Sequence, residues 1–120
     1  VIGFSRAADL LLTGRLIMGT EAAEMGLASQ ALPTEEVLPA AMTIARDIAE
    51  NVAPVSAALA KQLMWNGLTV GIDEMIAAEG RLLPGLIKAP DSGEGVRAFF
   101  EKRTPKWQMR VSTDVPDLGI

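Results

Sequence analysis

The sequence contains no cysteine and no histidine among its 120 residues. The missing cysteines exclude disulfides, and the absence of both residue types excludes zinc sites built on them and ordinary haem ligation. Cys–His pairs and Ser–His–Asp triads are excluded for the same reason. Any acid–base chemistry must therefore use Asp, Glu, Lys or Arg side chains.

Long apolar runs and an excess of positive charge are also missing. The apolar stretches are a few residues long, far short of the roughly 20 needed to cross a bilayer, and no signal-peptide pattern is present. Eleven Lys and Arg against 15 Asp and Glu give a net charge of −4, which does not favour nucleic-acid binding. We expect neither a membrane nor a nucleic acid as partner, and a cytoplasmic location. Because the chain starts at Val1, we expect a fragment or a processed protein.

What is present is the composition of one globular, helical domain. Hydrophobic residues make up 49% and charged residues 22% of the chain, as in folded soluble proteins. No alternation of strands and helices is visible, so we predict an all-α architecture of five or six helices. At most one short strand is expected, over residues 27–32.

Proline and glycine divide the chain into these helical segments. The strongest helical periodicity covers residues 37–52, where apolar side chains recur at helical spacing. Helix starts are predicted at Thr34 and Pro54. Helix ends are predicted at three glycines, namely Gly14, Gly26 and Gly67.

Two further signals concern the second half of the chain. Pro84, followed by glycine, is expected to end or kink a helix. Asp91 and Glu94 have the spacing of a capping box, with Asp91 as the cap. The last ten residues, 111–120, show no period, and we expect them to be loose or docked on a partner.

Several side chains are candidates for chemistry, each with a structural alternative. Adjacent carboxylates could act as acid and base, but solvated helix faces and first-turn positions explain them as well. Gly93 and Gly95 near a helix start could cradle a phosphate, but they lack a preceding strand and a third glycine. The carboxylates are Glu21 with Glu24, Glu35 with Glu36, Asp73 with Glu74, and Glu79.

The segment 97–110 combines cations with aromatic rings. It holds five Lys and Arg residues against the single acid Glu101, together with two Phe and one Trp. Phe99 and Lys102 are three residues apart and would share a helix face. A ring beside a cation suits a purine that carries a phosphate. The alternative is a core Phe and cations that favour a helix end, and composition alone favours that alternative.

Five motifs occur in an order that resembles the C-terminal part of the enoyl-CoA hydratase/isomerase (crotonase) superfamily. The resemblance covers residues 3 to about 107. Each motif is short, and the ordered set carries the resemblance. The motifs are ADLLLTGR at 8–15, EA at 21–22 with GLA at 26–28, Pro33 with EEV at 35–37, AP at 53–54 with Lys61, and DSGEGVRAFFEKR at 91–103 followed by Pro105 and Trp107.

The resemblance implies a division of the chain and a location for the chemistry. Residues 1–110 would be the helical C-terminal, trimerisation region of the family fold, without its spiral ββα core, and residues 111–120 an irregular tail. The oxyanion hole and the acid–base glutamates would lie upstream, so no catalytic residue is assigned here and the segment alone should be inactive. The longer protein to which this segment would belong is expected to hydrate or isomerise enoyl-CoA, with a CoA thioester as substrate and no prosthetic group or metal.

One ligand contact is implied within the chain itself. In several members of the family, the residues that match Phe99 and Lys102 reach the adenine and the 3′-phosphate of a CoA held by the adjacent subunit. The resemblance also implies a homotrimer or a dimer of trimers. A non-catalytic helical assembly module is the alternative that the sequence leaves open.

Overall fold

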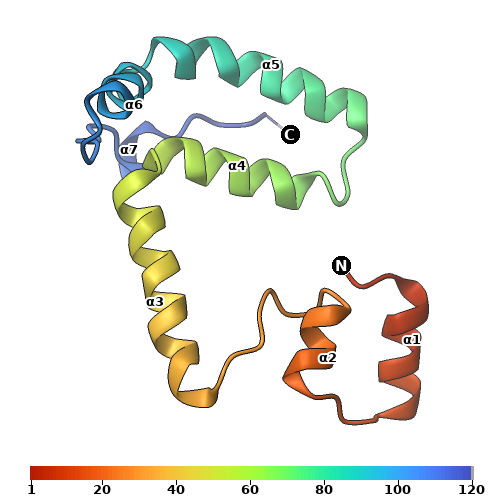
Figure 1. Ribbon diagram of the computed structural model, residues 1–120. Coiled ribbons are helices and arrows are strands. Elements are labelled where there is room, and N and C mark those ends of the chain that lie inside the picture. The colour runs from red at the N-terminus through yellow and green to blue at the C-terminus, as the bar shows by residue number, and fades with distance from the viewer. Residues whose placement is uncertain (120) are drawn as a thin grey trace. The chain divides into compact units, whose positions relative to one another are not determined.

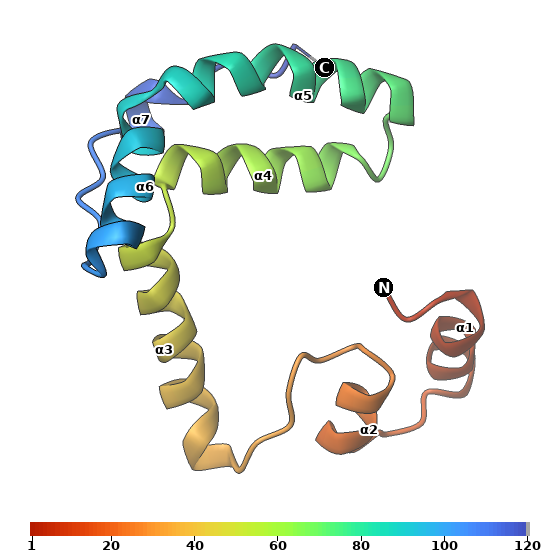
Figure 2. The ribbon, with the colours of Figure 1, turned by 45° about the horizontal axis from the view of Figure 1, so that its top comes forward.

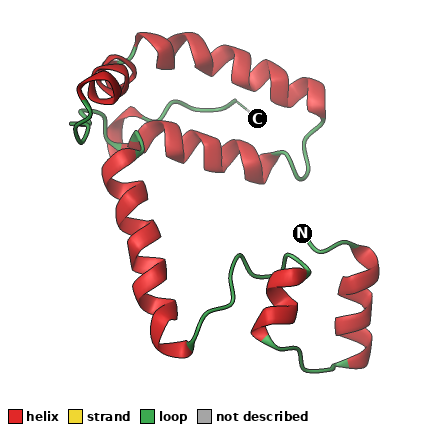
Figure 3. Cartoon of the chain, viewed as in Figure 1, coloured by secondary structure: helices red, strands yellow, loops and turns green. Residues whose placement is uncertain are grey.

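The computed structural model describes residues 1–119, and every regular element in that range is a helix (Figure 3). This confirms the predicted all-α architecture. The helices are α1 (Phe4–Thr13), α2 (Gly19–Glu24), α3 (Thr34–Asn51), α4 (Pro54–Asn66), α5 (Ile72–Lys88), α6 (Pro90–Glu101) and α7 (Val111–Asp114).

The short strand that the sequence allowed over residues 27–32 is not formed. The amide groups of Leu27 and Ala28 both donate to the carbonyl of Ala22, at 2.8 and 3.1 Å, and so close the end of α2. The residues that follow are irregular up to the start of α3. A strand needs a partner to pair with, and the described residues supply none.

The chain forms two compact units, and the first is Val1–Thr43. It contains α1, α2 and the beginning of α3, and none of its residues is buried. Arg15 joins the first two helices, because its Nε lies 2.8 Å from Asp9 Oδ2 and its Nη2 lies 2.7 Å from Glu21 Oε1. These ion pairs and a hydrogen bond from Arg6 Nη1 to the carbonyl of Met25, at 3.0 Å, rather than a buried core, therefore link these helices.

Most predicted helix boundaries are confirmed. Gly14 ends α1 in the left-handed region with φ of 63°, and Gly26 follows α2 with φ of 80°. Pro54 occupies the first position of α4, and Gly67 caps its end. Gly14, Gly26 and Pro54 act through their own backbone preferences, which explains why their positions could be predicted locally. Gly67 has an ordinary helical φ of −62°, so its place at the helix end does not depend on a conformation special to glycine.

Pro84 is an exception, because α5 continues past it to Lys88. Proline lacks one N–H, which would otherwise donate to the carbonyl four residues earlier. That carbonyl belongs to Gly80, which carries no side chain. The buried residues Ala78 and Leu82 hold the preceding part of the helix against its neighbours, so the loss of one hydrogen bond does not end α5.

The second unit, Ile44–Ile120, contains the core. Helices α4 and α5 run side by side and are joined by a short loop (Figures 1 and 2). Val55 and Leu59 of α4 pack with Leu82 of α5 and with Leu118 from the C-terminal segment. All four side chains are at least 92% buried, so this cluster supplies the main apolar stabilisation of the unit.

The C-terminal tail is better ordered than predicted. Residues 111–114 form α7, and Leu118 is buried in the core with an exposed fraction of 6%. Arg81 Nη2 donates to the carbonyl of Leu118 at 3.1 Å and fixes the tail to α5. The tail thus packs against its own chain through residue 119, and Ile120 lies outside the described residues. The side chains of Val115 and Leu118 drive this packing although they follow no helical period.

Candidate functional site

The candidate site consists of α6 and the loop that follows it. Two buried carboxylates on α6 connect these two segments. Asp91 and Glu94 have exposed fractions of 5% and 4%. The predicted capping box is wrong, because Pro90 opens α6 and Asp91 lies inside its first turn. Asp91 Oδ1 instead accepts from the backbone amides of Gln108, at 2.7 Å, and Met109, at 3.3 Å. We call Asp91 and Glu94 the carboxylate anchors.

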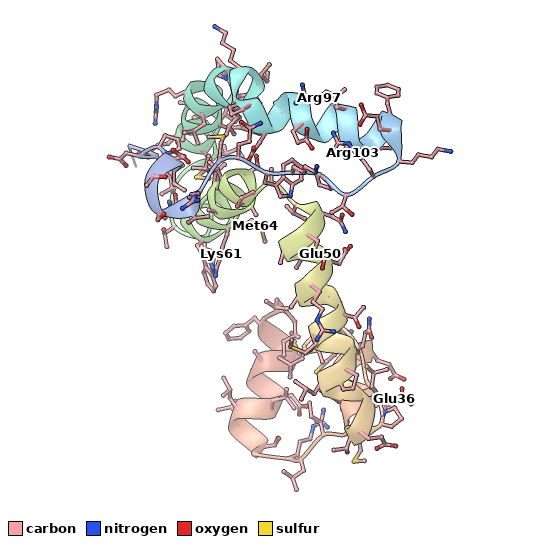
Figure 4. The ribbon with its side chains drawn as sticks, turned by 90° about the vertical axis from the view of Figure 1, so that its left-hand side faces the viewer. Glu36, Glu50, Lys61, Met64, Arg97 and Arg103 are labelled. Atoms are coloured by element: carbon pink, nitrogen blue, oxygen red, sulfur yellow. The ribbon has the colours of Figure 1, made fainter. Side chains whose placement is uncertain are left out.

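Glu94 binds the same loop at two points. Arg103 donates through Nη1 to Glu94 Oε1 at 2.6 Å and through Nη2 to Oε2 at 3.2 Å. The backbone amide of Lys106 donates to Oε1 at 2.7 Å, and Arg97 Nη2 donates to Oε2 at 3.2 Å. Figure 4 shows Arg97 and Arg103 together at α6. The anchors therefore hold the loop 103–109 along the helix.

These contacts change the acidity of Glu94. The hydrogen bonds from Arg103, then from the Lys106 amide and Arg97, lower the pKa of the Glu94 carboxyl from 4.5 to about 2, against the opposing effect of burial. Donors that stabilise the charged form outweigh the cost of removing that charge from water. Glu94 is thus a carboxylate at every pH where the protein would normally function.

The lowered pKa predicts an acid-dependent loss of stability. A carboxyl group with a depressed pKa in the folded state contributes stability that is complete above its unfolded value, near 4.5. That contribution is lost as the pH falls towards 2. Urea unfolding of wild type and Glu94→Gln between pH 7 and pH 2 should show a difference in midpoint that shrinks through this window. A constant difference down to pH 2 would contradict the assignment.

Trp107 lies on the same loop and connects it to two helices. Its Nε1 donates to the carbonyl of Glu50, near the end of α3, at 3.0 Å. Its ring packs on α6 at Gly95, where an added Cβ would lie 3.5 Å from the ring. The indole therefore forms a fixed wall beside α6.

An open pocket of about 630 Å³ lies next to this wall. Phe99 and Phe100 are 78% and 77% exposed, and their rings meet edge to face with centroids 5.7 Å apart. Both members of the predicted pair, Phe99 and Lys102, line this pocket. The lining residues are Asn51, Gly95, Ala98, Phe99, Phe100, Lys102, Arg103, Pro105 and Trp107.

Lys102 does not continue the helix as the spacing alone would place it. It follows the end of α6 in the left-handed conformation, with φ of 52° and ψ of 45°. Its amide donates to the carbonyl of Phe99, and the amide of Arg103 donates to that of Ala98. This is the Schellman arrangement, in which the left-handed residue is usually glycine. A residue with a Cβ costs about 1 kcal/mol or more there.

The two neighbouring cations of the pocket differ in their partners. Arg103 is bound by Glu94 and by Glu101, with 2.6 Å between Arg103 Nη1 and Glu94 Oε1. Among residues 1–119, Lys102 forms no ion pair. The local positive charge of the pocket therefore resides on the Lys102 ammonium group.

The other candidates from the sequence do not converge on a site. Glu24, Glu35, Glu36, Asp73, Glu74 and Glu79 are exposed, and Glu21 is bound by Arg15. Gly93 and Gly95 lie within α6, on either side of Glu94, whose carboxylate already accepts a hydrogen bond from the amide of Lys106. The described part of the chain contains no group of three or more side chains suited to hold a metal ion. Within residues 1–119, no helix combines the length and apolar character needed to span a bilayer.

Comparison with known proteins decides the family. The model of the enoyl-CoA hydratase/isomerase family matches residues 1–110. The chain belongs to this family. The resemblance inferred from the ordered motifs is thereby confirmed, and the match ends where the C-terminal tail begins. Members of the family act on CoA thioesters.

Individual relatives agree with this assignment. The chain is 38% identical over 109 residues to the human enoyl-CoA hydratase domain-containing protein 2, mitochondrial, covering 88% of this chain and 37% of that protein. It is 37% identical over 106 residues to a probable mitochondrial enoyl-CoA hydratase of Dictyostelium discoideum, covering 88% of this chain and 38% of the relative. The chain thus spans less than half the length of these family members.

Solved structures of the family share the fold. A probable enoyl-CoA hydratase/isomerase from Mycobacterium abscessus matches with a TM-score of 0.87 and 42% identity, over 92% of this chain and 43% of that one. An enoyl-CoA hydratase from Bacillus anthracis matches with a TM-score of 0.80 and 38% identity, over 88% and 41%. The helical arrangement is therefore that of a part of the family fold.

Proposed function

We propose that this chain is the C-terminal part of a protein that hydrates or isomerises enoyl-CoA, and that its pocket beside α6 holds the adenine and 3′-phosphate end of the substrate. One observation carries the proposal. An exposed aromatic ring, Phe99, and an ammonium group without an ion-pair partner in residues 1–119, Lys102, line the same open pocket.

The chemistry of these two groups matches that end of CoA. An exposed aromatic face offers a purine a stacking surface, and a lysine ammonium binds a phosphate as a point charge. The carboxylate anchors support the site, because they hold the loop that carries Pro105 and Trp107 against α6. The anchors therefore fix one wall of the pocket.

The reaction itself would be carried out by residues outside this segment. Polarisation of a thioester carbonyl needs an oxyanion hole, and proton transfer needs positioned carboxylates. The anchors Asp91 and Glu94 are engaged by backbone amides and arginines, and we assign no catalytic role to any residue here. The proposed reaction needs a CoA thioester as substrate and no prosthetic group.

Exposed apolar surface supports a second role in assembly. Large apolar side chains are exposed on several helices, including Phe4 at 91%, Leu12 at 86% and Met64 at 76%. Since exposed apolar patches mark interaction surfaces, we propose that they pack on the rest of the protein and on neighbouring subunits of a homotrimer or a dimer of trimers. The same surface also favours the alternative, a non-catalytic assembly module. The expected cytoplasmic location stays a prediction, since relatives include bacterial and mitochondrial proteins.

Ligand binding tests the proposed CoA site. Titration of the chain with CoA, followed by calorimetry, should show binding that Phe99→Ala weakens by roughly tenfold or more, the value of one lost base–aromatic stack. The matched control is Phe4→Ala, another largely exposed ring that does not line the pocket, which should leave CoA binding unchanged.

Two results would count against this proposal. Equal losses in the two Phe variants would show that the ring in the pocket has no special role, and no CoA binding by the wild type would refute the site. Crotonyl-CoA turnover by the 120-residue chain alone would contradict the placement of the catalytic groups elsewhere. Upstream coding sequence with a glycine-rich oxyanion segment and paired glutamates would exclude the assembly-module alternative.

A further inference from the structure

The described part of the C-terminal tail, residues 111–119, lies outside the region matched by the family, which ends at residue 110. After α7 the tail runs along the hairpin that α4 and α5 form (Figure 1). Leu118 is buried in the core cluster, and Val115 packs against that cluster. Arg81 Nη2 of α5 donates to the carbonyl of Leu118 at 3.1 Å. The tail thus contacts the hairpin as a bound peptide does, through two side chains and one main-chain carbonyl.

Open space lies on both sides of the tail. A pocket of about 270 Å³ is lined by Pro116 of the tail and by Arg81 of α5, among others. A second pocket, of about 420 Å³, is lined by Gln62 and Asn66 of α4 and by residues 115–118. Because protein interiors contain few voids, the hairpin forms a groove that is wider than the single segment in it. The surface that we call the tail groove consists of Val55, Leu59, Gln62, Asn66, Arg81 and Leu82.

The tail carries its own conformational constraints. Pro116 fixes one φ angle, and the amide of Gly119 donates to Asp117 Oδ1 at 3.0 Å. Gly119 has a φ of 67°, which favours glycine. These features arise within four residues, so they reduce the entropy that the segment loses when it binds. Together with the side chains of Val115 and Leu118, they define Val-Pro-Asp-Leu-Gly as the sequence that the groove accepts.

We propose that the tail groove is a peptide-binding surface, and that the tail of a second copy of this chain can occupy it in place of the chain's own tail. The second copy is the partner that fits, because it carries the same five residues, and exchange of an identical segment requires no new kind of contact. The carboxylate anchor Asp91 binds the loop up to Met109. A chain's own tail therefore starts beside its groove and competes at high effective concentration.

This surface is independent of the proposed CoA site. The two pockets that flank the tail share no lining residue with the pocket beside α6. A failure of the CoA proposal would therefore leave this inference untouched, and the reverse also holds.

A labelled peptide tests the groove in the full-length chain. A fluorescein-labelled peptide of residues 111–119 represents the tail of the second copy, and fluorescence anisotropy measures its binding. The wild type would be compared with Leu118→Ala, which loosens the chain's own tail by removing a buried side chain. It would also be compared with Gly119→Ala, which removes no buried atom but strains the turn at a positive φ.

The expected effects have opposite signs in the chain and in the peptide. In the wild type, the own tail competes at an effective concentration on the order of 1 mM. The Leu118→Ala chain should therefore bind the peptide more than about tenfold tighter than the wild type, and Gly119→Ala roughly fivefold tighter. Introduced into the peptide instead, each substitution should weaken its binding to the Leu118→Ala chain by a similar factor. A purely structural role for these residues would not produce this reversal.

Three results would overturn the inference. The first is equal binding of the peptide by the wild type and by both variants, and the second is no binding by any of them. The third is equal binding of the normal peptide and of the peptide with Leu118→Ala, which would show unspecific apolar adhesion. If circular dichroism shows that the Leu118→Ala chain is unfolded, Gly119→Ala decides alone, because its core is intact. Molecular size is a poorer measure, since apolar side chains exposed elsewhere also favour association.

Discussion

Replacing Glu94 with alanine should lower the melting temperature of the chain by roughly 10 °C. Glu94 is 4% exposed and accepts hydrogen bonds from two arginines and from one backbone amide. Its removal leaves the amide of Lys106 without its partner and the guanidinium of Arg103 with the exposed Glu101 as its one remaining carboxylate among the described residues. Breaking one side of a buried, hydrogen-bonded ion pair destabilises strongly, because the other side stays uncompensated.

Glu101→Ala provides the matched control for this experiment. Glu101 also pairs with Arg103, but its side chain is 57% exposed. An exposed ion pair of this kind contributes little to stability, so the melting temperature should change by only a degree or two. Thermal unfolding followed by circular dichroism would measure both variants. Similar effects from the two substitutions would show that Glu94 is no more important than a surface carboxylate.

Replacing Leu118 with alanine should destabilise the chain by about 3 kcal/mol. The Leu118 side chain is 6% exposed and packs with Val55, Leu59 and Leu82 in the core of the second unit. Its truncation removes apolar contacts and leaves a cavity between α4 and α5 that the fixed helices cannot fill. Since the family match ends at residue 110, this contribution would come from outside the matched region.

The comparison for Leu118 is a leucine of the same unit that lies at the surface. Leu68 is 73% exposed, and Leu68→Ala should change the free energy of unfolding by less than about 0.5 kcal/mol. Urea unfolding measures both variants on the same scale. If Leu118→Ala unfolds at the same urea concentration as Leu68→Ala, the tail does not pack on the core as described.

Helix boundaries were largely predictable because their causes are local. Gly14 and Gly26 act through a positive φ and Pro54 through its fixed φ and missing N–H, and each stands where a helix ends or begins. At Pro84, where a helix end or kink was expected, α5 does not end but continues to Lys88. There, packing of the residues on the preceding turns outweighs the loss of one backbone hydrogen bond.

The carboxylate anchors show where local patterns become ambiguous. Asp91 and Glu94 have the spacing of a capping box, and the sequence contains no sign that they bind elsewhere. Their partners include backbone amides 17 and 12 residues further along the chain. Backbone amides occur at every position except proline, so no residue type in the loop reveals which of them will be bound.

The Phe99 and Lys102 pair was predicted from spacing and from the family resemblance, and both residues line one pocket. The left-handed backbone of Lys102 was not predicted, because that conformation is normally predicted where the sequence has a glycine or an asparagine. A lysine there gives no local signal. The composition of the basic segment 97–110 shows one acid, Glu101, within the segment. It gave no sign that Glu94, which lies outside the segment, binds two of its arginines.

By itself, the sequence determined the all-α character of residues 1–119, most helix boundaries and the family, because these follow from residue preferences and ordered motifs within short stretches. Only the tertiary structure decided that the tail buries Leu118 in the core and that Asp91 and Glu94 hold the loop after α6. It also decided which of two adjacent cations, Lys102 and Arg103, forms no ion pair within residues 1–119. The physical reason is that burial and ion pairing depend on which residues, distant in sequence, come into contact in the folded protein. Short sequence patterns do not specify those contacts.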